Sequence, residues 1–255
     1  MSSILAAWPA PPARLSLESE DVHVWRAELD QPVETLQALQ RLLSPDEKER
    51  AHRFHFRKHR EHFIVARGVL RTLLGNYLGV EPSRLRFSYT AYGKPALAVI
   101  REERPPLRFN LSHSGELALY GFTRGREIGL DLEFRREDFA SEQIAEHFFS
   151  EREVEMLRAL PLQLKTEGFF NCWTRKEAYI KAVGLGLSLP LDQFDVSLAP
   201  QEPVALLRTG DDEREAARWS LKALTPAEGY SAALAVEGHG WHLKCWGWTS
   251  GDNLR

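Results

Sequence analysis

The chain has 255 residues, of which 43% are hydrophobic and 27% are charged, and its formal net charge at pH 7 is -3. This length can fill one large core or two smaller ones, and the weak negative charge gives no general case for nucleic-acid binding. No apolar run approaches the length of a membrane span, the N-terminus lacks a secretory signal, and two cysteines do not indicate a disulfide scaffold, so we expect a cytoplasmic chain with no membrane or nucleic-acid partner.

The first 125 residues predict an irregular arm followed by a subdomain with two helices. Prolines at positions 9, 11 and 12 favour an arm without regular structure over residues 1–20. Ser44-Pro45-Asp46-Glu47 has the pattern of a capping box with proline at the first helical position, and a longer helical pattern covers about residues 58–78. A strand is expected at Leu85–Thr90, and we assign residues 21–125 to an N-terminal subdomain.

The central segment, residues 109–133, reads FNLSHSGELALYGFTRGREIGLDLE and predicts two strands. These cover Glu116–Phe122 and Glu127–Phe134, with a turn at Thr123–Arg126 between them. Ser112-His113-Ser114 comes just before the first strand, where we expect a turn. A histidine there can act as a base, a phosphate partner or an orienting donor, although a turn histidine that only satisfies local backbone groups is the commoner case.

The second of these strands places two carboxylates on one face. Asp131 and Glu133 lie on the same side as Gly129, because side chains in a strand alternate with a period of two. Neighbouring carboxylates repel unless a cation lies between them, and Mg²⁺ takes carboxylate oxygens, waters and phosphates as ligands. A polar outer strand face explains the pair equally well. Gly129 slightly favours a site, since a strand glycine leaves room for a ligand or another backbone.

The remaining half of the chain repeats the pattern of the first. Residues 150–153 again form a capping box, and a long helix past Pro161 carries Glu177 and Lys181 on one face before a glycine-rich end. A Glu–Lys pair at this spacing is also an ordinary surface feature. Later strands are expected at Phe194–Leu198, Trp219–Ala223, Tyr230–Val236 and Trp241–Trp248.

The order of these elements predicts an α+β fold with two similar halves. The first half ends near Gly125, and the second, residues 126–255, opens with the strand that carries the acidic pair. Sequence identity between the halves is negligible, so this prediction rests on the order of elements alone.

Five motifs together resemble the 4′-phosphopantetheinyl transferases. They are SPDEKERAHRF at 44–54, YGKP at 92–95, FNLSHS at 109–114, IGLDLE at 128–133 and WTRKEAYIKAVGLGLSLPL at 173–191. The first two point to the surfactin-synthetase-activating (Sfp-type) branch, and the resemblance spans roughly residues 21–236. It implies two subdomains related by a pseudo-twofold axis, each a small, mainly antiparallel sheet on a long helix, with coenzyme A in the cleft between them.

The resemblance also implies a reaction and the residues that perform it. The family transfers the phosphopantetheine arm of coenzyme A to a serine of an apo carrier protein and releases 3′,5′-ADP. Asp131, Glu133 and Glu177 match the family's Mg²⁺-binding positions, where Mn²⁺ accepts the same ligands. Glu177 also matches the proposed general base, and Lys181 a lysine that contacts the phosphates. Lys176 matches another substrate-contacting lysine, although its helical angle points it away from the Glu177–Lys181 face.

The nucleotide end of coenzyme A has its own set of matching residues. Arg50 and Arg67 match basic positions that hold phosphate, which suits a guanidinium because its donors form a fork. Lys94, Ser112 and His113 match residues around the adenosine and its 3′-phosphate. For each basic residue alone, solvated surface is the default interpretation.

The implied partner is an apo acyl or peptidyl carrier protein of fatty acid, polyketide or nonribosomal peptide synthesis. Two halves in one chain can form the whole cleft, so a monomer suffices. Two alternatives stay open: a metal-dependent phosphohydrolase, which would not need the basic and SHS matches, and a non-catalytic protein that binds coenzyme A or a carrier. The filled acidic positions argue against the non-catalytic alternative.

Overall fold

The computed structural model describes residues 8–98, 105–136, 138–210 and 213–251. Residues 8–20 form no helix or strand. The elements of the first half are β1 (Asp21–Glu28), α1 (Val33–Leu42), α2 (Pro45–His52), α3 (Arg57–Leu78), a 3₁₀ turn (Pro82–Arg84), β2 (Phe87–Tyr89), β3 (Pro95–Leu97), β4 (Leu107–Ser114) and β5 (Leu117–Arg124).

The second half begins with β6 (Ile128–Phe134), which carries the acidic pair. The elements after it are α4 (Glu142–Phe148), α5 (Glu151–Ala159), α6 (Leu162–Val183), two 3₁₀ turns (Gly186–Ser188 and Leu191–Gln193), β7 (Phe194–Val196), β8 (Leu206–Thr209), α7 (Glu213–Ala217), β9 (Trp219–Leu224), β10 (Tyr230–Glu237) and β11 (His242–Gly247).

The two halves share one order of elements and one order of strands. The larger sheets have the orders β11-β1-β5-β4 and β6-β10-β9, so that β1-β5-β4 corresponds to β6-β10-β9. In each half the opening strand leads through shorter helices to a 22-residue helix, α3 or α6, which ends at a left-handed glycine, Gly79 or Gly184. The predicted α+β fold of two similar halves is confirmed, each with a mainly antiparallel sheet and a long helix.

The last strand crosses from the second half of the chain to the first sheet. β11 returns to the first sheet and pairs in parallel with β1, with Trp25 opposite Trp246. The outer edge of β1 would otherwise present unpaired backbone groups. Trp246 also packs beside His23, with ring centroids 4.6 Å apart, so that the strand covers apolar surface as well.

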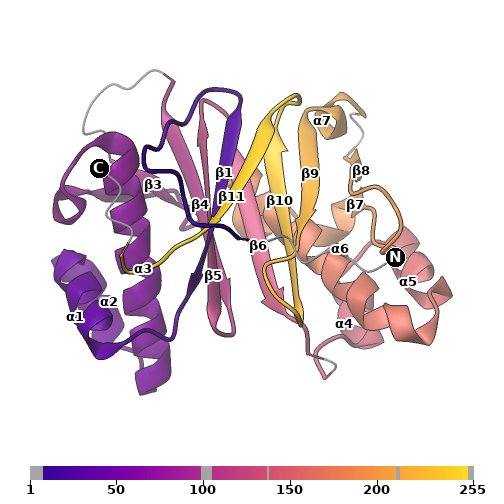
Figure 1. The fold of residues 1–255 in the computed structure, drawn as a ribbon. Coiled ribbons are helices and arrows are strands. Elements are labelled where there is room, and N and C mark those ends of the chain that lie inside the picture. Colours follow the sequence, from indigo (N-terminus) through magenta and orange to yellow (C-terminus); the bar gives the residue numbers. More distant parts are fainter. Residues whose placement is uncertain (1–7, 99–104, 137, 211–212, 252–255) are drawn as a thin grey trace.

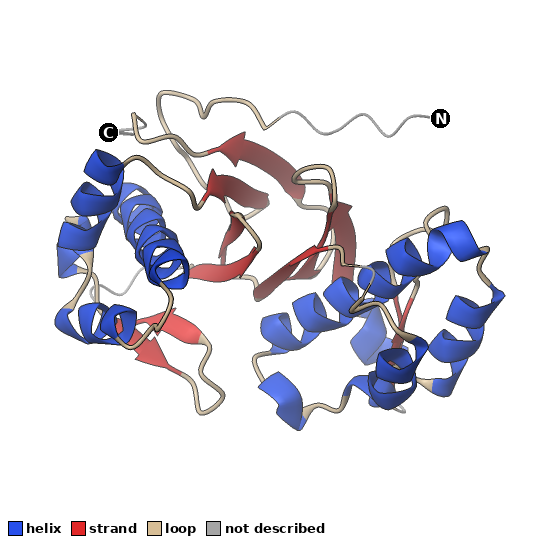
Figure 2. Ribbon diagram, turned by 90° about the horizontal axis from the view of Figure 1, so that it is seen from below, coloured by secondary structure: helices blue, strands red, loops and turns tan. Residues whose placement is uncertain are grey.

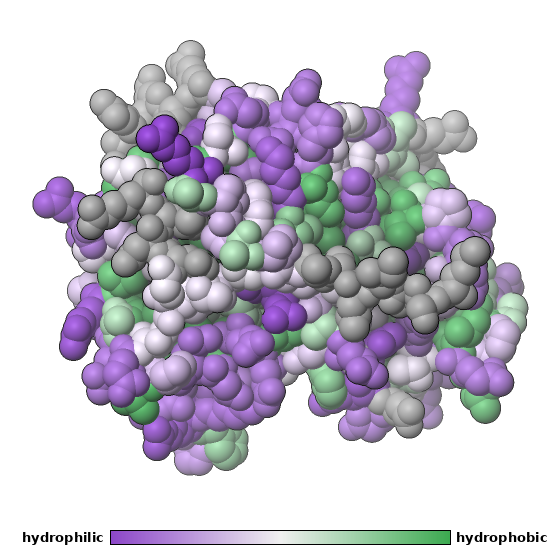
Figure 3. Space-filling view, viewed as in Figure 1, coloured by the Kyte–Doolittle hydropathy of each residue, from purple (hydrophilic) through white to green (hydrophobic). Residues whose placement is uncertain are grey.

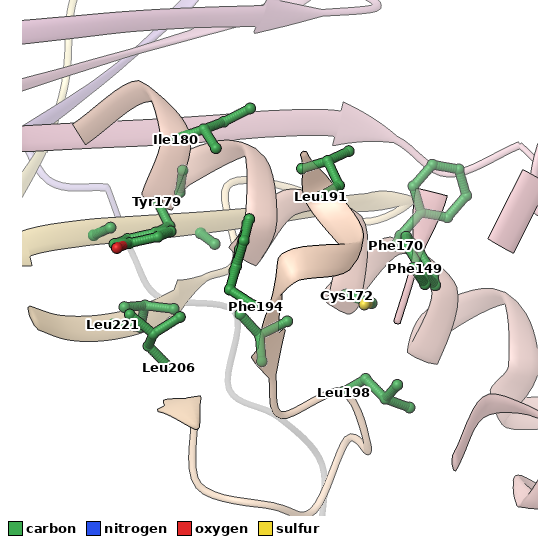
Figure 4. Packing of buried hydrophobic residues seen from close by; sticks show 14 of the residues in the cluster. Phe149, Phe170, Cys172, Tyr179, Ile180, Leu191, Phe194, Leu198, Leu206 and Leu221 are labelled. Carbon is green, nitrogen blue, oxygen red and sulfur yellow. The ribbon is translucent and has the colours of Figure 1, made fainter. Parts of the chain in front are cut away.

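The elements form four layers, with both sheets between two layers of helices (Figures 1 and 2). Along β1 and β5, successive side chains alternate between the two faces of the sheet. Trp25 and Tyr120 face α3, whereas Val24 and Leu119 face the second sheet. The inner faces of the two sheets pack on each other, and α6 covers the outer face of the second sheet. Figure 4 shows part of this outer core, where Tyr179 of α6 and Phe194 of β7 lie with ring centroids 5.0 Å apart.

Most predicted elements are confirmed, and one turn is wrong. Ser112-His113-Ser114 lies inside β4 rather than in a turn, and the hairpin to β5 follows at Gly115, whose φ is +57°. The eight-residue β4 (Leu107–Ser114) was missed although its apolar and polar residues alternate, because Asn and Ser are typical of turns and β4 has no β-branched residue. None of the helices in the described ranges is long and apolar enough to cross a membrane.

Candidate active site

The site begins with the alternation of β6. Leu130 and Leu132 face the first sheet and are buried there, while Gly129, Asp131 and Glu133 face α6. The predicted separation of apolar and acidic faces is therefore correct. The acidic face is not an outer, solvated one, because α6 packs over it.

Gly129 lets α6 approach β6 at backbone distance. A Cβ atom at this position would lie 2.1 Å from the carbonyl oxygen of Ala178 and 2.2 Å from the backbone nitrogen of Ala182. No side chain fits into that space, so of the two roles expected for this glycine, close approach of another backbone is the one observed. The close contact brings Lys181 of α6 over Asp131 of β6.

Asp131 and Lys181 form an ion pair at the centre of the site. Lys181 Nζ lies 2.5 Å from Asp131 Oδ1. Loss of hydration lowers the pKa of Lys181, but the Asp131 carboxylate outweighs it and leaves this pKa raised, so the ammonium stays charged. Asp131 is 3% exposed, and its Oδ2 has no hydrogen-bond partner among the described residues.

Two further carboxylates add negative charge beside this pair. Burial and the charge of Asp131 raise the pKa of Glu133. Burial also raises the pKa of Glu177, and the charges of Asp131 and Glu133 add to it, although Lys181 acts in the opposite direction. Three carboxylates thus face one ammonium group, which leaves a surplus of negative charge in a partly dehydrated place.

A pocket of about 270 Å³ lies along this site. Glu177 and Lys181 line it from α6, and Lys94 lines it from the loop between β2 and β3. The ammonium of Lys94 donates to the backbone oxygens of Ile128 and Ala182 and pairs with Glu127. Lys94 therefore ties the loop to both β6 and α6 and forms part of the pocket wall.

A second pocket, of about 720 Å³, lies at the far end of β4. His62 and Lys58 of α3 line it together with His113. Partial dehydration, with the charges of Lys181, His62 and Arg50, lowers the pKa of His113. The exposed Arg50 lies over the ring of Phe63, 5.4 Å from its centroid. The face shown in Figure 3 is mostly hydrophilic, and its lower edge is notched between the two halves.

Two basic residues expected to contact substrate are instead enclosed in the protein. Arg67 pairs with Glu47 at 2.5 Å and stacks on Phe87, and it lines neither pocket. Lys176 is 0% exposed, and its Nζ lies 2.7 Å from Glu153. The helical angle of Lys176 was the signal in the sequence, since it points this side chain away from Lys181. The burial of Arg67 had no such signal.

The acidic set fits a hard divalent cation in charge and in ligand type. Carboxylate oxygens suit Mg²⁺, and the buried, unpartnered Oδ2 of Asp131 is the kind of group that a cation satisfies. Within the described ranges, no three His, Cys, Asp or Glu side chains are already close enough together to hold an ion. The residues therefore fit a cation without forming a finished cage around it.

The chain matches two family models and several curated relatives. The model of the 4′-phosphopantetheinyl transferase superfamily matches residues 127–235, and that of the 4′-phosphopantetheinyl transferase N-terminal region matches residues 24–121. The 4′-phosphopantetheinyl transferase HetI of Nostoc is 46% identical over 239 residues, which cover 94% of this chain and 97% of HetI. Sfp of Bacillus subtilis is 33% identical over 164 residues, covering 64% of this chain and 70% of Sfp.

A human relative extends the comparison beyond bacteria. The L-aminoadipate-semialdehyde dehydrogenase-phosphopantetheinyl transferase of Homo sapiens is 27% identical over 213 residues, covering 77% of this chain and 67% of the relative. Both halves of the doubled α+β fold thus match models of the 4′-phosphopantetheinyl transferases. The chain belongs to the 4′-phosphopantetheinyl transferase superfamily, in its Sfp-type branch, and it is an enzyme that transfers 4′-phosphopantetheine.

Proposed function

We propose that the cleft between β4, β6 and α6 transfers the 4′-phosphopantetheine of coenzyme A to a serine of an apo acyl or peptidyl carrier protein. The serine oxygen forms a bond to the phosphorus that carries pantetheine, the bond from that phosphorus to the bridging oxygen breaks, and 3′,5′-ADP leaves. The observation that carries the proposal is the dehydrated Asp131–Lys181 pair with its unpartnered Oδ2, in a chain 46% identical to HetI over nearly its full length.

Asp131, Glu133 and Glu177 would hold Mg²⁺, or Mn²⁺ in its place. When bound, the cation neutralises charge on the diphosphate and so favours in-line displacement. The support is the surplus of negative charge described above and the raised pKa values of Glu133 and Glu177.

The remaining roles follow from the positions of the side chains. Glu177 takes the proton of the carrier serine. Burial raises the pKa of Glu177, which favours this role, whereas ligation of the cation would lower that pKa. Lys181 keeps its proton and stabilises the oxygen that leaves with 3′,5′-ADP. His113 and Arg50, beside the 720 Å³ pocket, bind the 3′-phosphate, and Lys94 shapes the wall against which the adenosine lies. We leave Arg67 and Lys176 out of this set because both are enclosed in ion pairs.

One chain supplies both halves of the cleft, which supports a monomer. Cys172 and Cys245 are both free, which is compatible with a cytoplasmic enzyme.

The proposal is tested by the intact mass of apo carrier proteins after incubation with the enzyme, coenzyme A and Mg²⁺. We expect a gain of about 340 Da, the mass of one phosphopantetheine, which is lost with EDTA because the reaction needs the cation. Asp131→Ala should lower the rate about 1,000-fold, since it removes charge stabilisation at the diphosphate. Asp192→Ala is the matched control, because Asp192 is an exposed aspartate outside the cleft and its loss should leave the rate unchanged.

Two outcomes would contradict the transferase. No mass gain on fatty-acid, polyketide or peptide carriers, despite binding of coenzyme A, would indicate the non-catalytic alternative. Release of free phosphopantetheine without any carrier would indicate a phosphohydrolase.

A further inference from the structure

β4 and β6 lie side by side, but no backbone ladder joins these two fully described strands. They belong to different sheets. Side chains of β4 bond to the backbone of β6 instead, at alternate residues and in the same direction along both strands. The bonds run from Leu130 N to Asn110 Oδ1 at 3.0 Å, from Leu132 N to Ser112 Oγ at 3.3 Å and from Phe134 N to Ser114 Oγ at 3.0 Å. We call these three bonds the seam.

The seam gives hydrogen-bond acceptors to backbone N–H groups on the unpaired edge of β6. β6 pairs with β10 along one side only, so the N–H groups on its other side have no strand as a partner. A buried N–H without a partner is costly. The three small polar side chains of β4 supply the missing acceptors.

Two of the three side chains also hold the carboxylates of β6. Ser112 Oγ lies 3.0 Å from Asp131 Oδ1, and Ser114 Oγ lies 2.8 Å from Glu133 Oε2. A hydroxyl has one hydrogen to donate, and backbone N–H and ammonium groups can only donate. Because Ser112 Oγ accepts from Leu132 N and from Lys181 Nζ, at 3.2 Å, its own hydrogen must point to Asp131. The same reasoning directs the hydrogen of Ser114 to Glu133.

We propose that Ser112 and Ser114 are positioning residues for the acidic site, and that Asn110 joins the strands only. This inference rests on the proposed function. Each serine fixes one oxygen of its carboxylate, so that the second oxygen of Asp131, buried and unpartnered, is left for a divalent cation. The alternating N-x-S-x-S of β4 thus has two roles. It accepts hydrogen bonds from the backbone of β6, and its serines orient the carboxylates of that strand. Ser112 acts through Asp131, in addition to the contact with the nucleotide end that the resemblance implies.

The test compares Asn110→Ala, Ser112→Ala and Ser114→Ala, each of which removes one bond of the seam. All three should lower the melting temperature. Mn²⁺ binding in the presence of saturating coenzyme A, followed by the electron paramagnetic resonance of free Mn²⁺, separates the roles. We expect the two serine variants to bind Mn²⁺ about 10-fold more weakly than the wild type, as for other groups that orient metal ligands. Asn110→Ala should bind Mn²⁺ as the wild type does.

Ser114→Thr keeps the hydroxyl and should restore Mn²⁺ binding. Ser114 lies at the partly exposed end of β4, so its variants carry the test even if Ser112→Ala does not fold. Equal Mn²⁺ affinity in all three alanine variants would overturn the positioning role, while a wild type that transfers phosphopantetheine would still support the proposed function. A wild type that neither binds Mn²⁺ with coenzyme A nor modifies a carrier would overturn the function itself.

Discussion

The two halves of the molecule share one framework but place different side chains between strand and helix. In both, a buried glutamate from the capping box pairs with the fifteenth residue of the long helix: Glu47 with Arg71, and Glu153 with Lys176. Both cations also donate to backbone oxygens after the helix, Arg71 to Pro82 and Leu85, and Lys176 to Leu191 and Phe194. This repeated bond fixes each long helix to the segment that follows it.

The strand faces that pack against the long helices differ between the two halves. On β1, His23, Trp25 and Ala27 face α3, and these side chains fill a wide, apolar gap. On β6, Gly129 lets α6 come to backbone distance, and Asp131 meets Lys181. The difference teaches that the same framework gives a core where the gap is filled by large rings and an active site where close contact brings charged groups together. Three experiments test this comparison.

The largest effect is expected from the buried ion pair of the second half. Lys176→Met should destabilise the protein by about 4 kcal/mol, because it leaves Glu153 buried without a cation. Arg67→Met should cost about 2 kcal/mol, since Glu47 keeps Arg71 as its partner. Urea unfolding of both variants measures the difference. Equal losses of unfolding free energy would show that the second cation beside Glu47 does not compensate for the loss of Arg67.

Next comes the close approach of α6 to β6. Gly129→Ala should cost about 3 kcal/mol and weaken Mn²⁺ binding, because the new methyl group must push α6 away from the strand. Gly121→Ala is the control: its Cβ would meet only the side-chain ends of Ile128 and Leu130, at 2.8 Å, and should cost about 1 kcal/mol. A Gly129→Ala protein as stable as wild type would mean that α6 moves away from β6 without cost.

The smallest effect is expected from His23, which is buried between β1 and α3 in the first half. His23 is 1% exposed, its Nδ1 lies 2.8 Å from Tyr77 Oη, and burial lowers its pKa to about 4 despite the nearby Asp21. Between pH 4 and pH 6.5 the unfolded chain therefore binds more protons than the folded one, so stability falls as the pH falls through this range. At pH 5 the loss relative to pH 8 should be about 2 kcal/mol.

Urea unfolding at several pH values measures this loss. His23→Gln should flatten the pH dependence, while His242→Gln, at an exposed histidine, should leave it in place. An unchanged slope in His23→Gln would assign the acid sensitivity to other groups.

Local patterns in the sequence were enough to predict the elements that begin and end with strong signals. The capping boxes at Ser44 and Ser150, the long helices and the alternation of β6 depend on neighbours within a few residues. The resemblance then named Asp131, Glu133, Glu177 and Lys181 as site residues, and the structure brings them to one face between β6 and α6. Burial, by contrast, depends on what packs against a residue, so Arg67 could not be separated from a phosphate-binding arginine by its local pattern.

The sequence by itself determined the doubled order of elements, because hydrophobic periodicity and capping are local properties of the chain. Only the tertiary structure decided that β11 crosses to the first sheet, that Lys176 is enclosed with Glu153, and that the serines of β4 reach the carboxylates of β6. These contacts join residues from 19 to 221 positions apart, as between Ser112 and Asp131 or between Asp21 and His242. No local pattern fixes such pairs, since they form only when whole layers pack and each buried polar group finds a partner.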